Sequence, residues 1–237
     1  MLTAQDIDVR FGGLTAVNDV SFQAPADQIL SIIGPNGAGK TTLFAVLSGF
    51  QKPTRGEVHL DGHLLSESPA HLVSRQGIAR TFQVVRPFPD MTVLDNVMVG
   101  AFARTQNFET ARDIANRVLH KVGLQGKLSF LAAYLTLPDL KLLEVAKALA
   151  TQPKYLLLDE VMAGLNLKEQ HSVASMLEGI HADGIGILLV EHSLAIVARM
   201  SDRVICLDSG KKIAEGTASE VLASKVVQAA YMGIDHG

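Results

Sequence analysis

Three short runs of this chain are almost wholly apolar, and they restrict its fold more than any other feature of the sequence. They are ILSII at 29–33, YLLLD at 155–159 and IGILLV at 185–190. Runs of this kind are typical of parallel strands that are covered on both faces. Helical patterns at 41–47, 140–150 and 167–180 lie between the strand-like runs, which also include 57–60 and 204–208. This alternation predicts an α/β fold with a largely parallel sheet.

The N-terminal third and the middle of the chain have different patterns. Segments 3–11, 17–24 and 56–65 alternate polar and apolar residues and include turn signals, which predicts a small antiparallel β layer. Between 84 and 150 no strand pattern is evident, and 108–124 has an amphipathic helical stripe. We therefore predict one domain over 1–237, with an α/β core at 1–83 and 151–237 and an inserted helical subdomain at 84–150.

Composition excludes several classes of protein. The 21 basic and 24 acidic residues form no basic field, so nucleic acid is not an expected partner. A single cysteine, Cys206, excludes an internal disulfide, and its apolar neighbours suggest core packing. No run approaches the ~18–20 apolar residues that span a bilayer, and the N-terminus lacks a signal peptide's apolar centre. We expect a soluble protein of a reducing compartment that meets membranes only through a partner.

The sequence GPNGAGKT at 34–41 directly follows the first apolar run and precedes a helix. It matches the phosphate-loop pattern G-x-x-x-x-G-K-[ST] at every fixed position. Glycines let backbone N–H groups curl around phosphate oxygens, and the helix N-terminus adds partial positive charge. Lys40 would contact the β- and γ-phosphates, and the Thr41 hydroxyl would ligate Mg²⁺. The predicted nucleotide-binding residues are Asn36, Gly37, Ala38, Gly39, Lys40, Thr41 and Thr42, and a plain glycine-rich turn is the alternative.

Acidic residues and a histidine follow the other two apolar runs. Asp159 ends the run at 155–159 and Glu160 directly follows it, at the carboxyl edge where parallel sheets place their ligand sites. Asp159 would support Mg²⁺ through its water shell, and Glu160 would orient the attacking water or accept its proton. His192 follows the run at 185–190 and could hydrogen-bond the γ-phosphate and that water. The alternatives are a plain surface carboxylate at Glu160 and a packed or solvated histidine.

Taken together, five motifs resemble an ABC-transporter ATPase subunit over essentially the whole chain. They are GPNGAGKTT, RTFQ at 80–83, LLLDE, AGLN at 163–166 and VEHS, in this order and spacing. Segments 10–22 and 77–100 most resemble the ATPases of branched-chain amino acid importers. Those importers typically use two different ATPase chains, and this chain resembles the longer one. The resemblance implies a P-loop NTPase core and ATP with Mg²⁺ as ligands.

The resemblance also assigns roles to residues outside the phosphate loop. Phe11 would stack on adenine, and Val17 would pack against the ring. Gln83 would ligate Mg²⁺ and sense the γ-phosphate, and His192 would be the switch histidine. Asn166 would lie in the loop that crosses a dimer interface. The segment after Gln83 would dock on transmembrane permease subunits, with ordinary packing inside the domain as the alternative.

The chain departs from the family where members carry a motif close to L-S-G-G-Q, which contacts the γ-phosphate held by the other subunit. Here these positions read LTLPD at 135–139. Thr136 can cap the helix or reach a phosphate, but Pro138 has no N–H to offer an anion. Asp139 suits the helix dipole, yet like charges at ~4 Å repel by roughly 1 kcal/mol even with water-like screening. We expect the fold to survive and the contact with the partner's nucleotide to be lost.

The sequence therefore predicts an ATP-hydrolysing subunit of an importer for branched-chain or related amino acids, amides or urea. Its partners would be permease subunits and a second ATPase chain in a heterodimer, with a homodimer as the alternative. It would be cytoplasmic, on the inner face of the cell membrane. Two other functions stay open: a catalytically weak regulatory nucleotide-binding subunit, and the ATPase of another ABC system such as a lipopolysaccharide exporter. A small P-loop kinase is rejected, because Gln83, AGLN and His192 would have no role.

Overall fold

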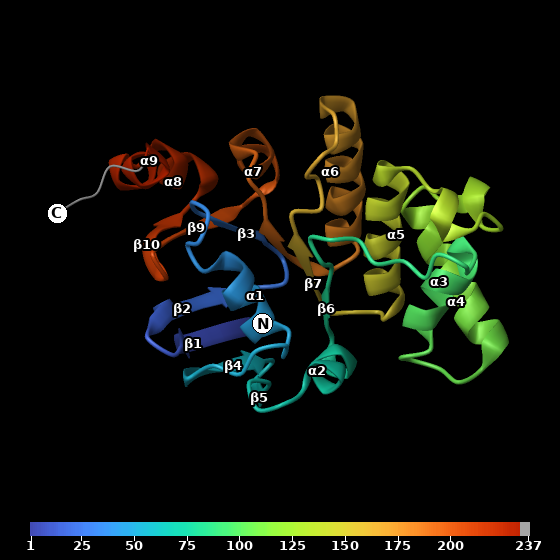
Figure 1. Cartoon of the computed structure of the whole chain (residues 1–237), viewed down its shortest axis with the longest axis horizontal. Coiled ribbons are helices and arrows are strands. Elements are labelled where there is room, and N and C mark those ends of the chain that lie inside the picture. The colour runs from blue at the N-terminus through green and yellow to red at the C-terminus, as the bar shows by residue number, and fades with distance from the viewer. Residues whose placement is uncertain (233–237) are drawn as a thin grey trace. The chain divides into compact units, whose positions relative to one another are not determined.

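The structure is a computed structural model that describes residues 1–232. The chain forms two compact units, one made of residues 1–73 with the C-terminal segment from 186, and the other of residues 74–185. The predicted helical segment 84–150 lies within the second unit (green to yellow in Figure 1). The last five residues of the predicted core segment 151–237 lie outside the described residues.

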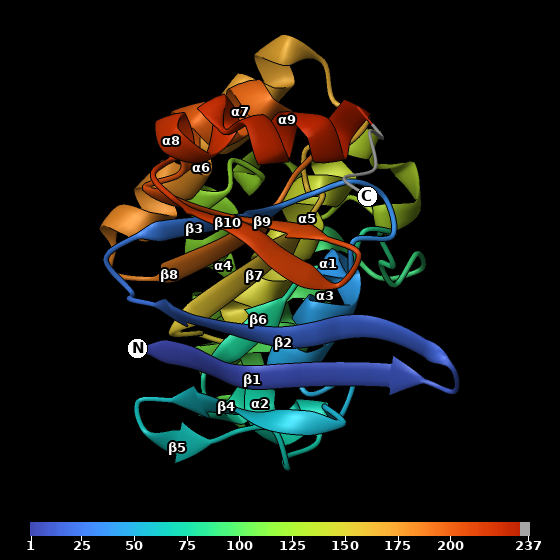
Figure 2. The same ribbon diagram turned by 90° about the vertical axis from the view of Figure 1, so that its left-hand side faces the viewer.

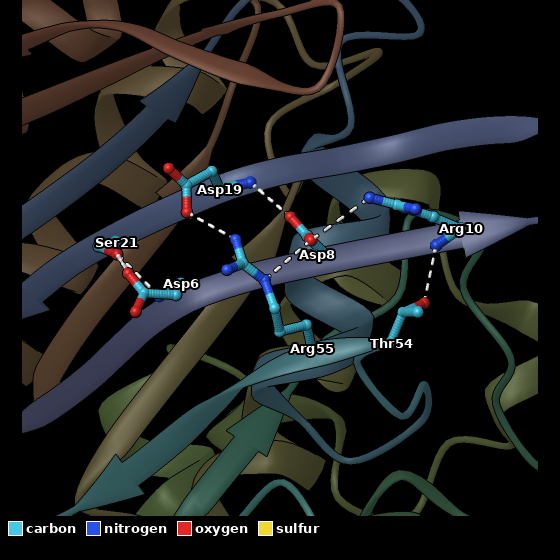
Figure 3. Close-up of polar contacts among 7 residues, drawn as sticks. All are labelled: Asp6, Asp8, Arg10, Asp19, Ser21, Thr54 and Arg55. Carbon is cyan, nitrogen blue, oxygen red and sulfur yellow. Dashed lines mark hydrogen bonds and ion pairs between the residues drawn. The ribbon is translucent and has the colours of Figure 1, made fainter.

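An antiparallel sheet forms the N-terminal part of the first unit, with strand order β2-β1-β4-β5 (Figure 2). The strands are β1 (Leu2–Phe11), β2 (Leu14–Ala24), β4 (Arg55–Leu60) and β5 (His63–Leu64). The β1–β2 register shifts between Ala4 and Ile7 and again before Val9, and Asp6 and Asp19 have positive φ angles of 49° and 54°. Polar side chains join these strands, including the nearly buried carboxylate of Asp8 (Figure 3).

A second sheet in the first unit has the strand order β10-β9-β3-β8. Strand β3 (Ile29–Ile33) pairs in parallel with β8 (Gly186–Val190) and with β9 (Arg203–Asp208), and β10 (Lys211–Gly216) is antiparallel to β9. The helices of this unit are α1 (Lys40–Leu47), α7 (Leu194–Met200), α8 (Ala218–Ala223) and α9 (Lys225–Met232). A buried cluster that includes Ile33, Val197, Cys206 and Val221 joins the strands to α7 and α8.

The second unit combines two parallel strands with helices. Strands β6 (Ile78–Arg80) and β7 (Tyr155–Asp159) pair in parallel. The helices are α3 (Val93–Ala101), α4 (Phe108–Lys121), α5 (Leu137–Ala150) and α6 (Leu167–Ala182), with short 3₁₀ turns η1 (Gln125–Lys127) and η2 (Ala132–Tyr134). Helix α2 (Ala70–Gln76) contains the point where the chain passes from the first unit to the second.

The fold class predicted from the sequence is confirmed: an α/β protein with a mainly parallel sheet, an N-terminal antiparallel sheet and a helical region. Strands β3 and β7 have the predicted ends, because each is an almost wholly apolar run whose residues are all buried. Cys206 is buried and free, as its apolar neighbours suggested. Helix α5 begins three residues before the predicted residue 140, because Thr136 caps it and Pro138 is compatible with a first turn.

Candidate functional site

The phosphate loop leaves β3 at Gly34 and enters α1 at Lys40. Gly34 and Gly39 have φ angles of 145° and 100°, and a Cβ atom would lie 2.1 Å from the Leu207 carbonyl oxygen at Gly34 and 2.4 Å from the Ala16 carbonyl oxygen at Gly39. Only glycine fits these two positions without moving backbone. The loop therefore packs closely against β9 at its first glycine and against β2 at its last.

Lys40 places its ammonium group inside the loop. The residue is 6% exposed, and its Nζ donates to the carbonyl oxygens of Gly34 at 2.8 Å and Pro35 at 2.9 Å. No side chain caps the N-terminus of α1, so its first N–H groups can face an anion. Asn36, Gly37 and Thr41 are exposed at the loop surface. This arrangement of donors and positive charge suits a phosphate group.

The other predicted loop residues are buried or half-buried beneath the exposed loop surface. Ala38 is buried, Gly39 is half-buried, and Thr42 on α1 is half-buried. Val17, on β2, is fully buried, and its Cγ2 would lie 3.5 Å from a Cβ at Gly39. Phe11 ends β1 and is 49% exposed, so its ring is accessible to a ligand.

His192 leaves the sheet at the same edge as the phosphate loop. Strands β3 and β8 are parallel neighbours with Ile32 opposite Val190. The loops that follow the two strands therefore leave the sheet at the same, carboxyl edge. His192 lies two residues beyond β8, and it is exposed. The first unit therefore brings together the phosphate loop and the predicted switch histidine at one sheet edge.

Tyr231 on α9 also contacts the phosphate loop, which the sequence did not predict. The Gly34 N–H donates to the Tyr231 hydroxyl oxygen at 3.0 Å. Burial raises the pKa of this phenol, and the hydrogen bond from Gly34 opposes that rise. A lone tyrosine near the end of a chain carries no sequence signal for such a contact.

In the second unit, Asp159 ends β7 and is almost fully buried. The Arg80 Nη2 donates to its Oδ2 at 2.8 Å, and the Thr81 hydroxyl accepts the Asp159 N–H at 3.2 Å. Its other carboxylate oxygen, Oδ1, is buried and has no hydrogen-bond partner within the described residues. One occupied and one open oxygen fit the predicted support of Mg²⁺ through the water shell of the ion.

Glu160, the residue after Asp159, contacts Gln83 through its side chain. The Gln83 Nε2 donates to Glu160 Oε2 at 2.7 Å. Glu160 is 9% exposed, and its φ angle is 52°, in the left-handed region that is uncommon for residues other than glycine. Buried Lys141 on α5 donates from Nζ to the carbonyl oxygens of Glu160 at 3.2 Å and Gln83 at 3.3 Å. The structure thus joins the predicted Gln83 and Glu160 through a lysine that the sequence reading missed.

The segment LTLPD begins α5 and is internally satisfied. Thr136 is the N-cap residue: its Oγ1 accepts the Asp139 N–H and donates to Asp139 Oδ2 at 2.7 Å. Lys127 forms an ion pair with Asp139, which is 9% exposed. Burial raises the pKa of Asp139, but hydrogen bonds from Lys127 and Thr136 outweigh it and hold this pKa below its usual range. The predicted negative charge is therefore present, but paired with a cation that the sequence reading did not identify.

Two further predicted positions lie in loops that the structure defines. Asn166 caps α6 in a capping box with Glu169. After Gln83, Val84 and Phe88 are 65% and 45% exposed. The buried Asn96 side chain on α3 bonds both the N–H and the carbonyl oxygen of Phe88, at 2.8 and 3.0 Å. The segment predicted to dock on a permease is thus exposed and tied to a helix.

In residues 1–232 no group of three or more His, Cys, Asp or Glu side chains is arranged to hold a metal ion. Over the same residues, every helix is too short or too polar to pass through a lipid bilayer.

The fold and the phosphate loop are those of a nucleotide-binding protein, and comparison with known proteins identifies its class. The family model described as ABC transporter matches residues 17–163. The chain belongs to this family, as an ATP-binding subunit and ATPase. It is 38% identical to the high-affinity branched-chain amino acid transport ATP-binding protein LivG of Salmonella typhimurium and 35% identical to BraF, of the same description, from Pseudomonas aeruginosa. Each comparison covers 98% of both chains.

The chain is also similar to an export ATPase and to solved structures of ATP-binding cassettes. The lipopolysaccharide export system ATP-binding protein LptB of Escherichia coli is 30% identical, over 99% of this chain and 98% of that protein. Among solved structures, the ADP conformation of the ATP-binding cassette MJ1267 superposes with a TM-score of 0.90 at 30% identity. A nucleotide-free ATP-binding cassette superposes with a TM-score of 0.89 at 29% identity, and both cover 98% of each chain.

Proposed function

We propose that the chain powers an importer of branched-chain or related amino acids, amides or urea. The observation that carries this proposal is full-length similarity, at 35–38% identity, to proteins described as branched-chain amino acid transport ATP-binding proteins. The lipopolysaccharide export relative is less similar, at 30%. We further propose that it is the longer of two ATPase chains, and that it works at the inner face of the membrane through its partners.

We propose that ATP hydrolysis uses the predicted residues in defined roles. Lys40 and the loop N–H groups bind the phosphates, and Phe11 stacks on adenine. Thr41, Gln83 and Asp159 would hold Mg²⁺, directly or through its water shell, and the bound ion would offset phosphate charge. The water oxygen bonds to the γ-phosphorus as the bond from that phosphorus to the β–γ bridging oxygen breaks. Glu160 accepts the proton of the water, and His192 hydrogen-bonds the departing phosphate.

Permease docking is proposed at the surface formed by Val84 and Phe88. Exposed apolar side chains on a helix-anchored segment suit burial in a protein interface. A tagged copy of the chain should co-purify with membrane subunits from its own cells. Phe88→Ser should reduce that co-purification, whereas Phe50→Ser, at an exposed position of the first unit, should not. Equal recovery with all three proteins would refute this surface.

The importer itself is tested by uptake. Cells that lack the chain should lose uptake of labelled leucine, isoleucine and valine, or of related amides and urea. Wild-type protein should restore uptake, and Lys40→Ala should not, because it lacks the enclosed ammonium group. If deletion instead leaves all of these uptakes intact and impairs the outer envelope, the lipopolysaccharide export alternative is correct.

A second candidate, a regulatory subunit that binds ATP and hydrolyses it weakly, is favoured by the start of α5. Pro138 offers no N–H there, and Asp139 adds a buried carboxylate. Single-turnover hydrolysis in the assembled transporter separates the two candidates, with Glu160→Gln as the inactive reference. A rate equal to that reference would identify a regulatory subunit, and a rate well above it an ATPase of the importer.

A further inference from the structure

Lys141 is a buried cation that donates hydrogen bonds to the backbone of two residues of the proposed site, Gln83 and Glu160. It is 5% exposed, and within the described residues its hydrogen bonds go to two backbone carbonyl oxygens, those of Gln83 and Glu160. Burying an ammonium group is costly, and a methionine would fill similar space without that cost. Packing alone therefore gives no reason for a lysine at this position.

Gln83 and Glu160 are joined twice: Lys141 bonds the backbone of both residues, and their side chains bond each other. The Lys141 Nζ holds the two backbones, while Gln83 Nε2 donates to Glu160 Oε2 at 2.7 Å. The Glu160 carbonyl oxygen also accepts the Ala163 N–H at 3.2 Å. Lys141 thus stabilises the turn that keeps Glu160 at its unusual φ angle of 52°.

Lys141 also lies at the start of α5, two residues beyond Asp139. Thr136 and Lys127 hold Asp139, so the first turn of α5 is fixed to the segment that precedes it. Any displacement of the first turns of α5 carries the Lys141 ammonium group with it. The backbones of Gln83 and Glu160 are therefore linked mechanically to the end of α5 that carries LTLPD.

We infer that Lys141 is a positioning residue for hydrolysis, which holds the Gln83 and Glu160 backbones so that only their side chains exchange partners. This inference rests on the proposed roles of those two residues. In the structure, the Gln83 amide occupies Glu160 Oε2. When the Gln83 side chain turns to its proposed Mg²⁺ position, Oε2 is released to accept a hydrogen bond from water, and Lys141 keeps the carboxylate in place. Movement of α5 alters this alignment and so regulates the hydrolytic step.

The inference is tested with variants of the chain assembled with the subunits that co-purify with it. Lys141→Met removes the ammonium group, and Lys141→Arg retains a buried donor. Lys225→Met is the matched control, since Lys225 is exposed on α9. Because misplacing catalytic groups by about 1 Å can cost on the order of a hundredfold, Lys141→Met should lower kcat by roughly tenfold to a hundredfold and leave the KM for ATP nearly unchanged. Lys141→Arg should recover part of kcat.

Hydrogen exchange provides a readout independent of turnover. In Lys141→Met, peptides that cover 81–84 and 160–164 should exchange faster, while peptides of the phosphate loop keep wild-type rates. The melting temperature should change little, because the loss of two hydrogen bonds to carbonyl oxygens is offset by the removal of a buried charge. A purely structural lysine would instead lower the melting temperature and weaken ATP binding together with kcat, which would overturn the inference.

A Glu160→Gln variant separates failure of the inference from failure of the proposed site. If Glu160→Gln stops hydrolysis and Lys141→Met leaves kcat unchanged, the positioning role is wrong and the proposed site stands. If Glu160→Gln hydrolyses ATP at the wild-type rate, the proposed role of Glu160 is wrong, and the inference falls with it.

Discussion

Tyr231 contacts the first glycine of the phosphate loop through its hydroxyl oxygen, 3.0 Å from the Gly34 nitrogen. Tyr231→Phe leaves that N–H without this acceptor and keeps the aromatic packing of α9. A neutral hydrogen bond contributes about 0.5–1.5 kcal/mol, so we expect ATP binding to weaken by about twofold to tenfold. Titration with a fluorescent nucleotide measures this change.

Tyr134→Phe is the matched control for Tyr231→Phe. Tyr134 is 78% exposed on η2, so loss of its hydroxyl should affect neither nucleotide affinity nor melting temperature. Wild-type affinity in Tyr231→Phe would show that the loop keeps its shape without the tyrosine.

At the level of residues, the sequence identified the groups that belong to local motifs and missed their partners. Lys40 was predicted because the phosphate-loop pattern is contiguous. Arg80, Lys127 and Tyr231 reach their partners across 79, 12 and 197 residues, and Lys141 reaches Gln83 across 58. No short pattern encodes a pairing between such distant positions, because the fold alone brings them together.

At the level of elements, Asp8 joins the first three strands of the antiparallel sheet (Figure 3). Its Oδ1 accepts the Asp19 N–H of β2 at 2.7 Å, and its Oδ2 accepts from Arg55 Nε of β4 at 3.1 Å. The hydrogen bond from Asp19 lowers the pKa of Asp8, burial raises it, and Arg55 and Arg10 lower it further, so the pKa lies below its ordinary value.

This depressed pKa predicts acid sensitivity. Because the unfolded-state pKa of aspartate is about 3.9, ionised Asp8 stabilises the fold fully above that pH. The contribution is lost as the pH falls through the lower folded-state pKa. We expect the melting temperature of Asp8→Asn to fall less than that of the wild type between neutral pH and about pH 3. Asp27→Asn, at an exposed position, should follow the wild-type curve, and parallel curves for Asp8→Asn would refute the linkage.

The N-cap of α5 should contribute to the stability of the protein. The Thr136 hydroxyl accepts the Asp139 N–H and bonds the Asp139 carboxylate. Thr136→Ala should destabilise the protein by about 1 kcal/mol, the usual cost of losing such a cap, whereas Thr136→Ser should be nearly neutral. Thermal or urea unfolding of both variants tests this, and equal stability of Thr136→Ala and the wild type would show that the cap contributes nothing.

Elements were predicted best where burial leaves a continuous signal. Strands β3, β7 and β8 are short runs in which every residue is buried, and this gives them a continuous, almost wholly apolar pattern. Strand β6 spans only Ile78–Arg80, too few residues for any periodicity, and it was not predicted. The start of α5 was placed late, because Leu137, Pro138 and Asp139 do not fit its apolar stripe although they belong to its first turn.

At the level of the whole molecule, dimerisation and permease binding lie beyond what one chain can encode. LivG of Salmonella typhimurium is described as a transport ATP-binding protein, and we propose a second ATPase chain and permease subunits as partners of this chain. The sequence contains no residue of a partner, so the transported substrate and the composition of the proposed dimer could not be derived from it. The candidate site residues could be predicted because their motifs are short and lie within this chain.

The sequence LTLPD at 135–139 predicts that the two ATP sites of an assembled heterodimer differ in activity. In a heterodimer, the phosphate loop, Glu160 and His192 of this chain would be completed by an intact motif of the second ATPase chain, which gives one competent site. The other site would face LTLPD, where Pro138 lacks an N–H and Asp139 adds a paired but negative carboxylate. Hydrolysis should therefore be slow for the purified chain and rise on mixing, by on the order of a hundredfold if the missing donor acts on the transition state.

Restoring the family residues tests the physical cause of this asymmetry. Pro138→Gly with Asp139→Gln returns an N–H donor and removes the carboxylate, so we expect hydrolysis by the chain alone to rise toward that of the mixed pair. Lys127→Ala in this background is the control, because Lys127 pairs only with Asp139 among the described residues and should then have no effect on the rate. Equal rates for the unmixed wild-type chain and the mixed pair, together with no change in the double variant, would rule out asymmetric sites. The contact across the dimer would then not depend on a backbone donor at position 138.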